Sequence, residues 1–403
     1  MDNILYCGDN LDILQKNIGK ESIDLIYIDP PFFSNRQYEV IWGDEAEIRS
    51  FKDRWEGGIE NYIQWMKPRI EAMYEVLKST GSFYLHCDWH ANAHLRIMLD
   101  EIFGGRNFKN EIIWHYVSPG YPKDRFSRKH DTILFYTKSK KYIFNQDDIR
   151  IPYDAERLAR ATEDKNGDLV YVHGPGFGVT KIHPKGKVCD DVWFMDIINS
   201  MAKERLGYPT QKPEALLERI IKASSNEGDM ILDAFCGCGT AMAVAHMLNR
   251  KWIGIDISPT AIKLVGKRLK KVGAVKGEHY RIIGMPITIS ALHKLEPFEF
   301  QNWVIGEIPG ARASRKKTGD MGIDGYIPKS ILHKETGIQI KQSENIGRNV
   351  IDNFKSALDR KQYKKGIVVA FSFSKGASEE VARLKNTGEL DISLITIEEL
   401  LKK

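Results

Sequence analysis

Cysteine is scarce in this chain, and long hydrophobic runs are missing. Its five cysteines among 403 residues form no Cys-x-x-Cys pair, which is typical of reduced thiols and excludes a small disulfide-stabilised scaffold. The sequence holds no apolar run of the roughly 18 residues that a membrane-spanning helix needs, so we expect no contact with a membrane. The first residues lack the basic start and apolar core of a secretory signal. Together these absences predict a cytoplasmic protein.

Internal repeats, low-complexity tracts and a dominant sign of charge are absent as well. With 42% hydrophobic residues, the chain is neither disordered nor collagen-like, and its length suits two domains of about 100–200 residues. The formal net charge is only +5. Residues 115–142 are an exception, because seven Lys or Arg side chains stand against only two acidic ones there. That basic segment suits contact with phosphates, although a solvated loop has the same composition.

Short β-rich apolar runs alternate with helical stretches over most of the first 283 residues. This rhythm predicts an α/β fold with a doubly wound sheet. We expect strands at 4–7, 23–28, 82–86, 111–116, 131–137, 230–233 and 252–255, and helices at 62–78, 90–102, 213–225, 240–248 and 259–271. Residues 118–212 are polar, rich in Gly and Pro, and weakly periodic. We interpret them as an insertion with small structures of its own rather than as part of the sheet.

The pattern resets around residues 284–297, where Pro286 and Pro297 bracket an expected linker. Beyond it we expect strands at 323–327, 337–341, 366–370 and 391–395, and helices at 350–358, 378–386 and 397–401. These elements predict a second, smaller α/β domain. We therefore place the first domain at 1–285, the linker at 286–298 and the second domain at 299–403.

A glycine-containing loop in the first domain has the features of a nucleotide-type site. The sequence MILDAFCGCGT forms a strand that ends in Asp233, followed by Gly237 and Gly239 and the start of a helix. The glycines let a ligand approach the backbone, and a helix N-terminus offers free N–H groups. The next strand ends in Asp256, whose carboxylate suits ribose hydroxyls. A G-x-G-x-x-G motif and a Walker lysine are missing, which favours a small adenosine cofactor over NAD or ATP.

A second strand runs into the loop Asp29-Pro30-Pro31-Phe32. Proline has no backbone N–H, so the loop presents carbonyls and a carboxylate as hydrogen-bond acceptors beside an aromatic ring. Such a loop could accept both hydrogens of an exocyclic amino group while the ring stacks on the base. The alternative is an ordinary Asp-Pro turn at a strand end.

The loop DPPF followed far downstream by DAFCGCGT resembles the DNA amino-methyltransferases, which methylate adenine N6 or cytosine N4 with S-adenosylmethionine. LYCGDNLDIL resembles the segment before the catalytic strand, GSFYLHCDWH the next strand, and TQKP the segment that closes over the methionine end of the cofactor. The order, catalytic loop first, is that of the circularly permuted β group. The resemblance covers nearly all of 1–283. It implies a Rossmann-like S-adenosylmethionine-dependent methyltransferase sheet with a target-recognition insertion at 116–205.

The resemblance also implies a role for individual residues. Asp29 and the carbonyl of Pro30 would accept the hydrogens of the target amine, and Phe32 would stack on a base flipped out of double-stranded DNA. Asp9 would face the adenine of the cofactor, and Asp256 would hold its ribose. The other implied cofactor-binding residues are Lys212, Pro213, Asp233, Phe235, Cys236 (where the family commonly has Gly or Ser), Gly237, Gly239, Thr240 and Ile257.

Target recognition is expected within 116–205. There we expect DNA phosphates to be contacted by Lys123, Arg125, Arg128 and Lys129. The loop 33–55 is a second candidate for closing over DNA. In the family, Asp before Pro-Pro is commoner among adenine enzymes and Ser among cytosine enzymes, so we expect adenine N6 methylation, with cytosine N4 as the alternative. The sequence leaves a homodimer open.

The second domain carries a short motif of its own. Asp324 is followed by Gln339 and Lys341, which share one face of the expected strand. Asp324 and Gln339 could hold Mg²⁺ beside a phosphate, with Lys341 stabilising charge. The segment resembles the Mrr-like branch of the restriction-endonuclease fold, with Gln in place of the usual acid in Q-x-K. That implies an endonuclease of a restriction-modification system. The alternatives are a domain that only grips DNA, and a restriction component whose main activity is cleavage.

Overall fold

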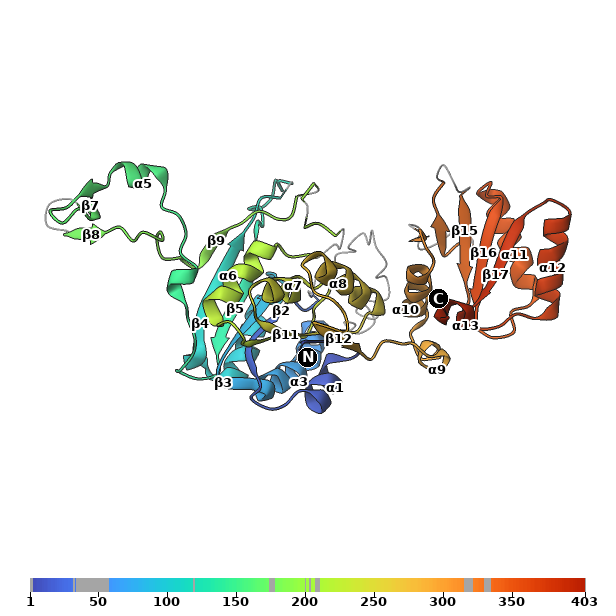
Figure 1. The fold of residues 1–403 in the computed structure, drawn as a ribbon, viewed down its shortest axis with the longest axis horizontal. Coiled ribbons are helices and arrows are strands. Elements are labelled where there is room, and N and C mark those ends of the chain that lie inside the picture. Colours follow the sequence, from blue (N-terminus) through green and yellow to red (C-terminus); the bar gives the residue numbers. More distant parts are fainter. Residues whose placement is uncertain are drawn as a thin grey trace.

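The computed structural model describes residues 3–31, 33, 58–118, 120–173, 178–199, 201–202, 204–206, 211–314, 322–329 and 335–402. Within these residues the strands form a nine-stranded, a five-stranded and a three-stranded sheet (Figure 1). No helix of the described part is both long and apolar enough to cross a bilayer.

The nine-stranded sheet forms the body of the first domain, and its strand order is β12-β1-β11-β10-β2-β3-β5-β4-β9. The strands are β1 (Asn3–Cys7), β2 (Ile23–Ile28), β3 (Leu77–Cys87), β4 (Phe108–His115), β5 (His130–Thr137), β9 (Val192–Phe194), β10 (Met230–Asp233), β11 (Lys251–Asp256) and β12 (Tyr280–Ile283). Neighbouring strands are parallel from β12 to β3, whereas β5 is antiparallel to both β3 and β4. The carboxyl ends of β1, β11, β10, β2 and β3 therefore share one edge.

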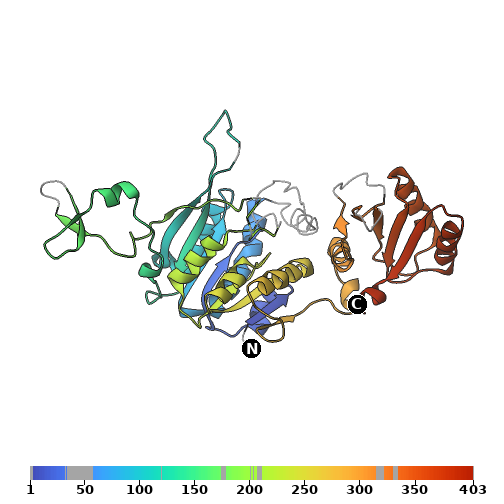
Figure 2. The ribbon, with the colours of Figure 1, turned by 45° about the horizontal axis from the view of Figure 1, so that its top comes forward.

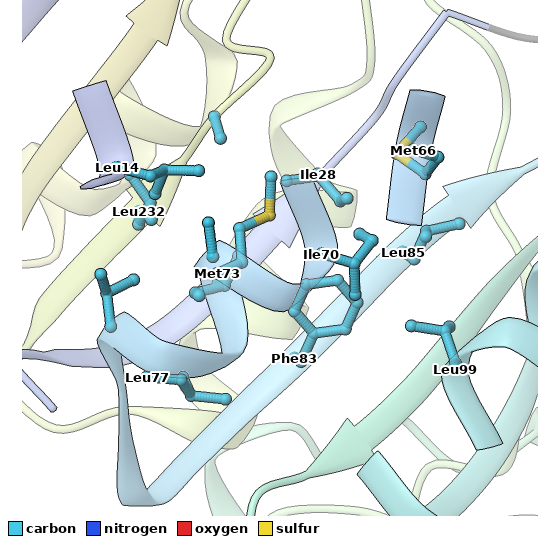
Figure 3. Packing of buried hydrophobic residues seen from close by; sticks show 14 of the residues in the cluster. Leu14, Ile28, Met66, Ile70, Met73, Leu77, Phe83, Leu85, Leu99 and Leu232 are labelled. Atoms are coloured by element: carbon cyan, nitrogen blue, oxygen red, sulfur yellow. The ribbon is translucent and has the colours of Figure 1, made fainter. Parts of the chain in front are cut away.

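Helices cover both faces of this sheet. One face carries α1 (Asn10–Asn17), α3 (Ile59–Val76) and α4 (Asn92–Leu99), and the other α6 (Glu214–Ser224), α7 (Thr240–Met247) and α8 (Pro259–Lys271). Strand residues alternate between the two cores. In β2, Ile26 and Ile28 belong to the cluster that contains α3 (Figure 3 labels Ile28), whereas Leu25 belongs to the cluster that contains α6 and α7. The doubly wound α/β fold is thus confirmed. The helix expected at 90–102 is shorter, because α4 gives way to a π-helical turn at Asp100–Gly104.

The polar segment 118–212 differs from the expectation because two of its strands, β5 and β9, belong to the main sheet. It does hold small structures of its own: η3 (Gln146–Asp148), α5 (Ala155–Ala159) and the sheet β6 (Thr162–Glu163), β7 (Leu169–Val172) and β8 (Val179–Lys181). However, β9 joins the main sheet beside β4, with the Trp193 side chain buried. An exposed strand edge leaves backbone groups unpaired, and β9 covers that of β4. A three-residue strand is too short to show a period in the sequence.

The five-stranded sheet belongs to the second domain, in the order β13-β14-β15-β16-β17. Its strands are β13 (Arg312–Ala313), β14 (Gly325–Ile327), β15 (Thr336–Ile340), β16 (Lys365–Ala370) and β17 (Asp391–Thr396), of which the last three are parallel. One face packs against α11 (Arg348–Arg360) and α12 (Lys375–Asn386), and the other against α10 (Pro297–Glu307) and α13 (Ile397–Leu401).

The segment expected as a linker contains a short helix, α9 (Ile289–His293). Leu292 is buried in the same apolar cluster as Phe300 of α10. The Gln342 side-chain amide donates to the carbonyls of Leu292 (3.2 Å) and Leu295 (2.7 Å). Part of this segment therefore packs on the second domain.

Candidate active site

Four carboxylates follow neighbouring strands at the carboxyl edge of the main sheet. Asp9 comes two residues after β1, Asp256 ends β11, Asp233 ends β10, and Asp29 follows β2 directly. Because these strands are adjacent and parallel, the fold brings together two loops that lie about 200 residues apart in sequence.

Asp29 is paired with a cation from a distant loop. Lys212 Nζ donates to Asp29 Oδ2, and the two side chains are only 10% and 16% exposed. The pair is therefore largely withdrawn from water, and each buried charge is stabilised by the other. A carboxylate has lone pairs for several donors, so this bond leaves Asp29 able to accept another hydrogen. Phe32, the stacking residue expected beside it, lies outside the described residues, as does most of the loop 33–55.

The cofactor loop is tied down by the carboxylates that flank it. Asp233 Oδ1 accepts from the backbone N–H of Phe235 at 3.0 Å. Asp256 accepts from the N–H of Gly237 through Oδ2 and from that of Ser258 through Oδ1, both at 2.8 Å. Asp256 thus joins the glycine loop to the start of α8, a role that sequence reasoning did not anticipate.

Burial disfavours the ionised forms of these acids. It raises the pKa of Asp256 to about 6. Burial, together with the charges of Asp29 and Asp256, also raises the pKa of Asp233 well above its ordinary value. A cationic ligand would stabilise the ionised carboxylates.

Asp9 is held by a residue that sequence reasoning missed. Arg69 Nη2 donates to Asp9 Oδ2 at 2.7 Å, and Arg69 Nε donates to Asn10 Oδ1 at 2.8 Å. The guanidinium lies 4.1 Å from the centroid of the Trp65 ring, which in turn lies 5.9 Å from that of Phe235. The available signal was an arginine on the buried stripe of α3, between Met66 and Met73.

The other expected cofactor residues surround the same loop. Thr240 begins α7, and its hydroxyl donates to the carbonyl of Lys212 at 3.4 Å and accepts from Arg268. Pro213 precedes α6, and Cys236 is buried with its N–H on the carbonyl of Ile255 at 3.0 Å. Ile257 is partly exposed after β11.

The hydrogen-bond acceptors at this edge of the sheet fit the cofactor that the resemblance implies. S-adenosylmethionine carries an adenine amino group, ribose hydroxyls, an ammonium and a sulfonium, all of which are hydrogen donors or cations. The edge offers acceptors in Asp9, Asp233 and Asp256, and Gly237 and Gly239 adopt left-handed conformations (φ 46° and 78°) that keep side chains out of the loop.

A series of hydrogen-bonded side chains, most of them buried, begins two residues before Asp29, and no sequence motif predicted it. Tyr27 Oη is 3.0 Å from His86 Nδ1, His86 Nε2 is 3.3 Å from Asp131 Oδ2, and Tyr116 Oη donates to Asp131 Oδ1 at 3.0 Å. His86, Asp88 and His90 alternate along the chain, but His90 bonds Asp88 whereas His86 contacts Tyr27 and Asp131. Among the described residues, no three His, Cys, Asp or Glu side chains gather in a way that could hold a metal ion.

The four basic residues expected to meet DNA lie in the loop between β4 and β5, but they differ in their contacts. Lys123 and Arg125 are exposed, and Arg125 pairs with the neighbouring Asp124 at 2.7 Å. The Arg128 guanidinium lies 3.5 Å from the centroid of the Trp89 ring. Lys129 Nζ donates to backbone carbonyls of the loop itself, including that of Gly120 at 3.0 Å. Lys129 therefore holds the loop as well as carrying charge.

In the second domain, the structure brings Asp324 beside the Q-x-K segment. Asp324 Oδ2 accepts from the N–H of Ile340 at 2.7 Å, and its own N–H donates to the carbonyl of Ile338 at 2.8 Å. The Gln339 side chain is buried, and its Oε1 has no hydrogen-bond partner among the described residues. Lys341 follows directly after β15. An unpartnered amide oxygen beside a carboxylate suits a hard cation.

Comparisons with known proteins follow the same division of the chain. Residues 23–267 match the family described as DNA methylase, and residues 292–403 match the family described as restriction endonuclease. The chain is 34% identical over 271 residues to the type II methyltransferase M.HpaI of Haemophilus parainfluenzae, covering 67% of this chain and 74% of that one. It is 33% identical over 265 residues to the DNA adenine methyltransferase YhdJ of Escherichia coli (strain K12), covering 65% and 81%.

Among solved structures, PvuII DNA methyltransferase (cytosine-N4-specific) is similar with a TM-score of 0.47 and 17% identity, covering 68% of this chain and 88% of that one. The match of the family to more than half of the chain decides the assignment. S-adenosylmethionine is accordingly the methyl donor. The chain belongs to the DNA methylase family of the N6-adenine and N4-cytosine enzymes, and it carries a restriction-endonuclease-like domain after the methyltransferase domain.

Proposed function

We propose that this protein methylates the N6 atom of adenine at a specific sequence in double-stranded DNA. The observation that carries the proposal is the Asp29–Lys212 pair at the edge shared by the two loops. A carboxylate is a stronger acceptor than a hydroxyl for an amino group, and Asp stands where the cytosine enzymes commonly have Ser. The similarity to a DNA adenine methyltransferase supports the same target. Cytosine N4 is the second candidate.

The target amine is a poor nucleophile because its lone pair is delocalised into the ring. Asp29 and the carbonyl of Pro30 would accept its two hydrogens, which draws the nitrogen toward tetrahedral geometry and aims its lone pair. The negative charge of Asp29 would also stabilise the positive charge that develops on that nitrogen. Lys212 would hold the carboxylate in place through their ion pair. The bound S-adenosylmethionine supplies an electrophilic methyl carbon on a sulfonium.

Reaching the amine requires the base to leave the helix. Inside a duplex the amino group is stacked and paired, so the base must be flipped out at a cost of a few kcal/mol. Pro30 and Pro31 restrict the backbone of the receiving loop and reduce the entropy lost when the base enters.

The test of the proposed function is methyl transfer by the purified chain to DNA, with a chelator present. Digestion of the DNA to nucleosides and mass spectrometry identify the product. We expect N6-methyldeoxyadenosine, and none from Asp29→Asn, which keeps the size of the side chain. N4-methyldeoxycytidine would select the second candidate, and the absence of any methylated nucleoside would contradict both.

A specific observation favours a second activity in the C-terminal domain. We infer that Asp324 and the unpartnered Oε1 of Gln339 would hold Mg²⁺, with Lys341 placed to stabilise charge on a phosphate. Gln is neutral, so such a site lacks one negative charge, and we expect weak metal affinity and slow cleavage. With Mg²⁺ or Mn²⁺ the chain should nick DNA, and Lys341→Ala should not, whereas the exposed Lys375→Ala should behave as wild type. Nicking that survives Lys341→Ala would reject this site, and no nicking by the wild type would favour a domain that only grips DNA.

A further inference from the structure

The loop between β4 and β5 projects from the edge of the sheet that carries Asp29. β5 runs antiparallel to β3, and Thr132 pairs with Cys87 at the end of β3, so the loop emerges at the carboxyl edge. The N–H of Tyr116 donates to the carbonyl of Lys129 at 2.9 Å and closes the base of the loop as a hairpin. Figure 2 shows this hairpin standing out from the sheet.

The base of the hairpin is held by contacts between its cations and nearby aromatic rings. The Arg128 guanidinium lies 3.5 Å from the centroid of the Trp89 ring. Trp89 is two residues past the end of β3, so this contact packs the hairpin against the end of that strand. Lys129 Nζ lies 4.9 Å from the centroid of the Tyr121 ring. These contacts hold the hairpin next to the strand end that neighbours Asp29.

Phe126 is different, because its side chain is 98% exposed. Phe126 is three positions before Lys129, so an extended chain keeps its backbone within about 10 Å of the fixed base. Its neighbours Lys123, Arg125 and Arg128 are all basic, and none of them shields the ring from water. A fully exposed phenylalanine does nothing for the core, and its apolar ring amid cations suits a partner that combines phosphates with stacked bases.

We propose that Phe126 enters the stacked bases of the DNA duplex at the target site and occupies the space that the flipped base leaves. The proposal rests on the proposed function, since it needs a base to be flipped. Apolar side chains that insert between base steps unstack them, and stacking of the ring on the remaining bases compensates for the contacts that the target base loses. The flanking cations bring the hairpin to the backbone, which places the ring without reading the sequence.

The proposal makes Phe126 necessary only while the target base is paired and stacked. A target base that faces an abasic site is already weakly held, so it leaves the helix at a lower cost. Loss of the ring should then slow methylation of a fully paired duplex and leave an abasic duplex nearly unaffected. A ring that merely added contact area to the DNA would matter equally for both duplexes.

The experiment compares methyl transfer to two duplexes that carry the mapped methylation site, one fully paired and one with an abasic site opposite the target base. For Phe126→Ala we expect kcat/KM to fall about tenfold or more on the paired duplex and less than about threefold on the abasic one. Phe126→Trp should restore the rate on the paired duplex, and Ser127→Ala, the change at the next residue, should match wild type.

Equal losses on both duplexes, or an unchanged rate on the paired duplex, would overturn the role of Phe126 while wild-type transfer still supports the proposed function. Absence of wild-type transfer to either duplex would overturn both. Calorimetric binding of S-adenosylmethionine to each variant verifies that the cofactor site is intact.

Discussion

Lys212 contacts both loops of the site. TQKP resembles a segment over the cofactor, yet the ammonium of Lys212 contacts Asp29. Its backbone carbonyl accepts from Thr240, the first residue of α7, so Lys212 links the two loops of the site. We infer that its side chain serves the carboxylate of Asp29, while its backbone supports the cofactor loop.

Replacement of Lys212 separates these roles. Lys212→Met removes the cation that positions the Asp29 carboxylate, and since misplacement of a catalytic group costs about 100-fold, we expect turnover to fall by about that factor. Affinity for S-adenosylmethionine should change less than about threefold, and Lys212→Arg should recover part of the turnover. Turnover and calorimetric cofactor affinity are the two measurements. A large loss of affinity with normal turnover at saturation would show that the side chain holds the cofactor instead.

Cofactor binding should depend on pH because of Asp256, whose pKa burial raises to about 6. A cationic ligand favours the ionised carboxylate, so binding releases a proton where Asp256 is protonated in the free protein. Affinity for S-adenosylmethionine should therefore be constant above about pH 6 and weaken as the pH falls below it. Calorimetry between pH 5 and 8 measures this. Asp256→Asn should bind more weakly at pH 8 and show a flatter profile; an identical pH profile in that variant would contradict the assignment.

At the residue scale, the sequence located the acidic side chains that lie at the ends of buried strands. Asp29, Asp233 and Asp256 were found because each ends a buried run, and parallel strands deliver such ends to one edge. The Arg69–Asp9 bond and the chain from Tyr27 to Asp131 were missed. Those partners come from different elements, and which side chains meet is decided by packing rather than by local pattern.

At the element scale, hydrophobic periodicity located the strands and helices of both domains to within a few residues. Among the elements that were not foreseen are α1, α9, β9, β12 and β13, and the π-helical turn after α4 was expected as α-helix. Each is held by tertiary contacts that leave little local signal. The cluster in Figure 3 shows the opposite case, where Ile70 and Met73 on α3 repeat with helical spacing and meet Phe83 on β3.

The turn into α7 offers a test of why glycine stands at position 239. Gly239 has φ +78°, and a Cβ there would lie 2.7 Å from Val265 Cγ1 on α8; Gly228 has φ +83° with nothing within 4 Å. Gly228→Ala should cost about 1 kcal/mol of unfolding free energy from backbone strain alone, whereas Gly239→Ala should cost about 2–4 kcal/mol because overpacking is added. Urea unfolding measures both. Equal losses would show that contact with α8 is not the constraint.

At the scale of the whole molecule, the two domains meet through α8 and α10. Lys263 on α8 pairs with Glu307 on α10, and its ammonium lies 5.4 Å from the centroid of the Trp303 ring. Helix α8 begins three residues after Asp256, so the helix that carries this contact is also the one that Asp256 ties to the cofactor loop.

Charge reversal tests whether this ion pair holds the domains together. The pair is partly exposed, so its loss costs about 1 kcal/mol or less, but Lys263→Glu also places two negative charges together. We expect proteolysis within residues 284–297 to become several-fold faster in Lys263→Glu. The double variant Lys263→Glu with Glu307→Lys should return to the wild-type rate. Cleavage that is unchanged in the single variant, or not restored in the double, would show that other contacts dominate.

The identity of the methylated base tests the proposed role of Asp29 most directly. The measurement is a long-read map of modified bases in the DNA of cells that express the chain, beside cells that express Asp29→Asn at the same level. We predict N6-methyladenine at one short sequence motif with the wild-type chain and at no motif with the variant. A map without modified bases, with methylation only on cytosine, or with the same adenines modified by Asp29→Asn would contradict it.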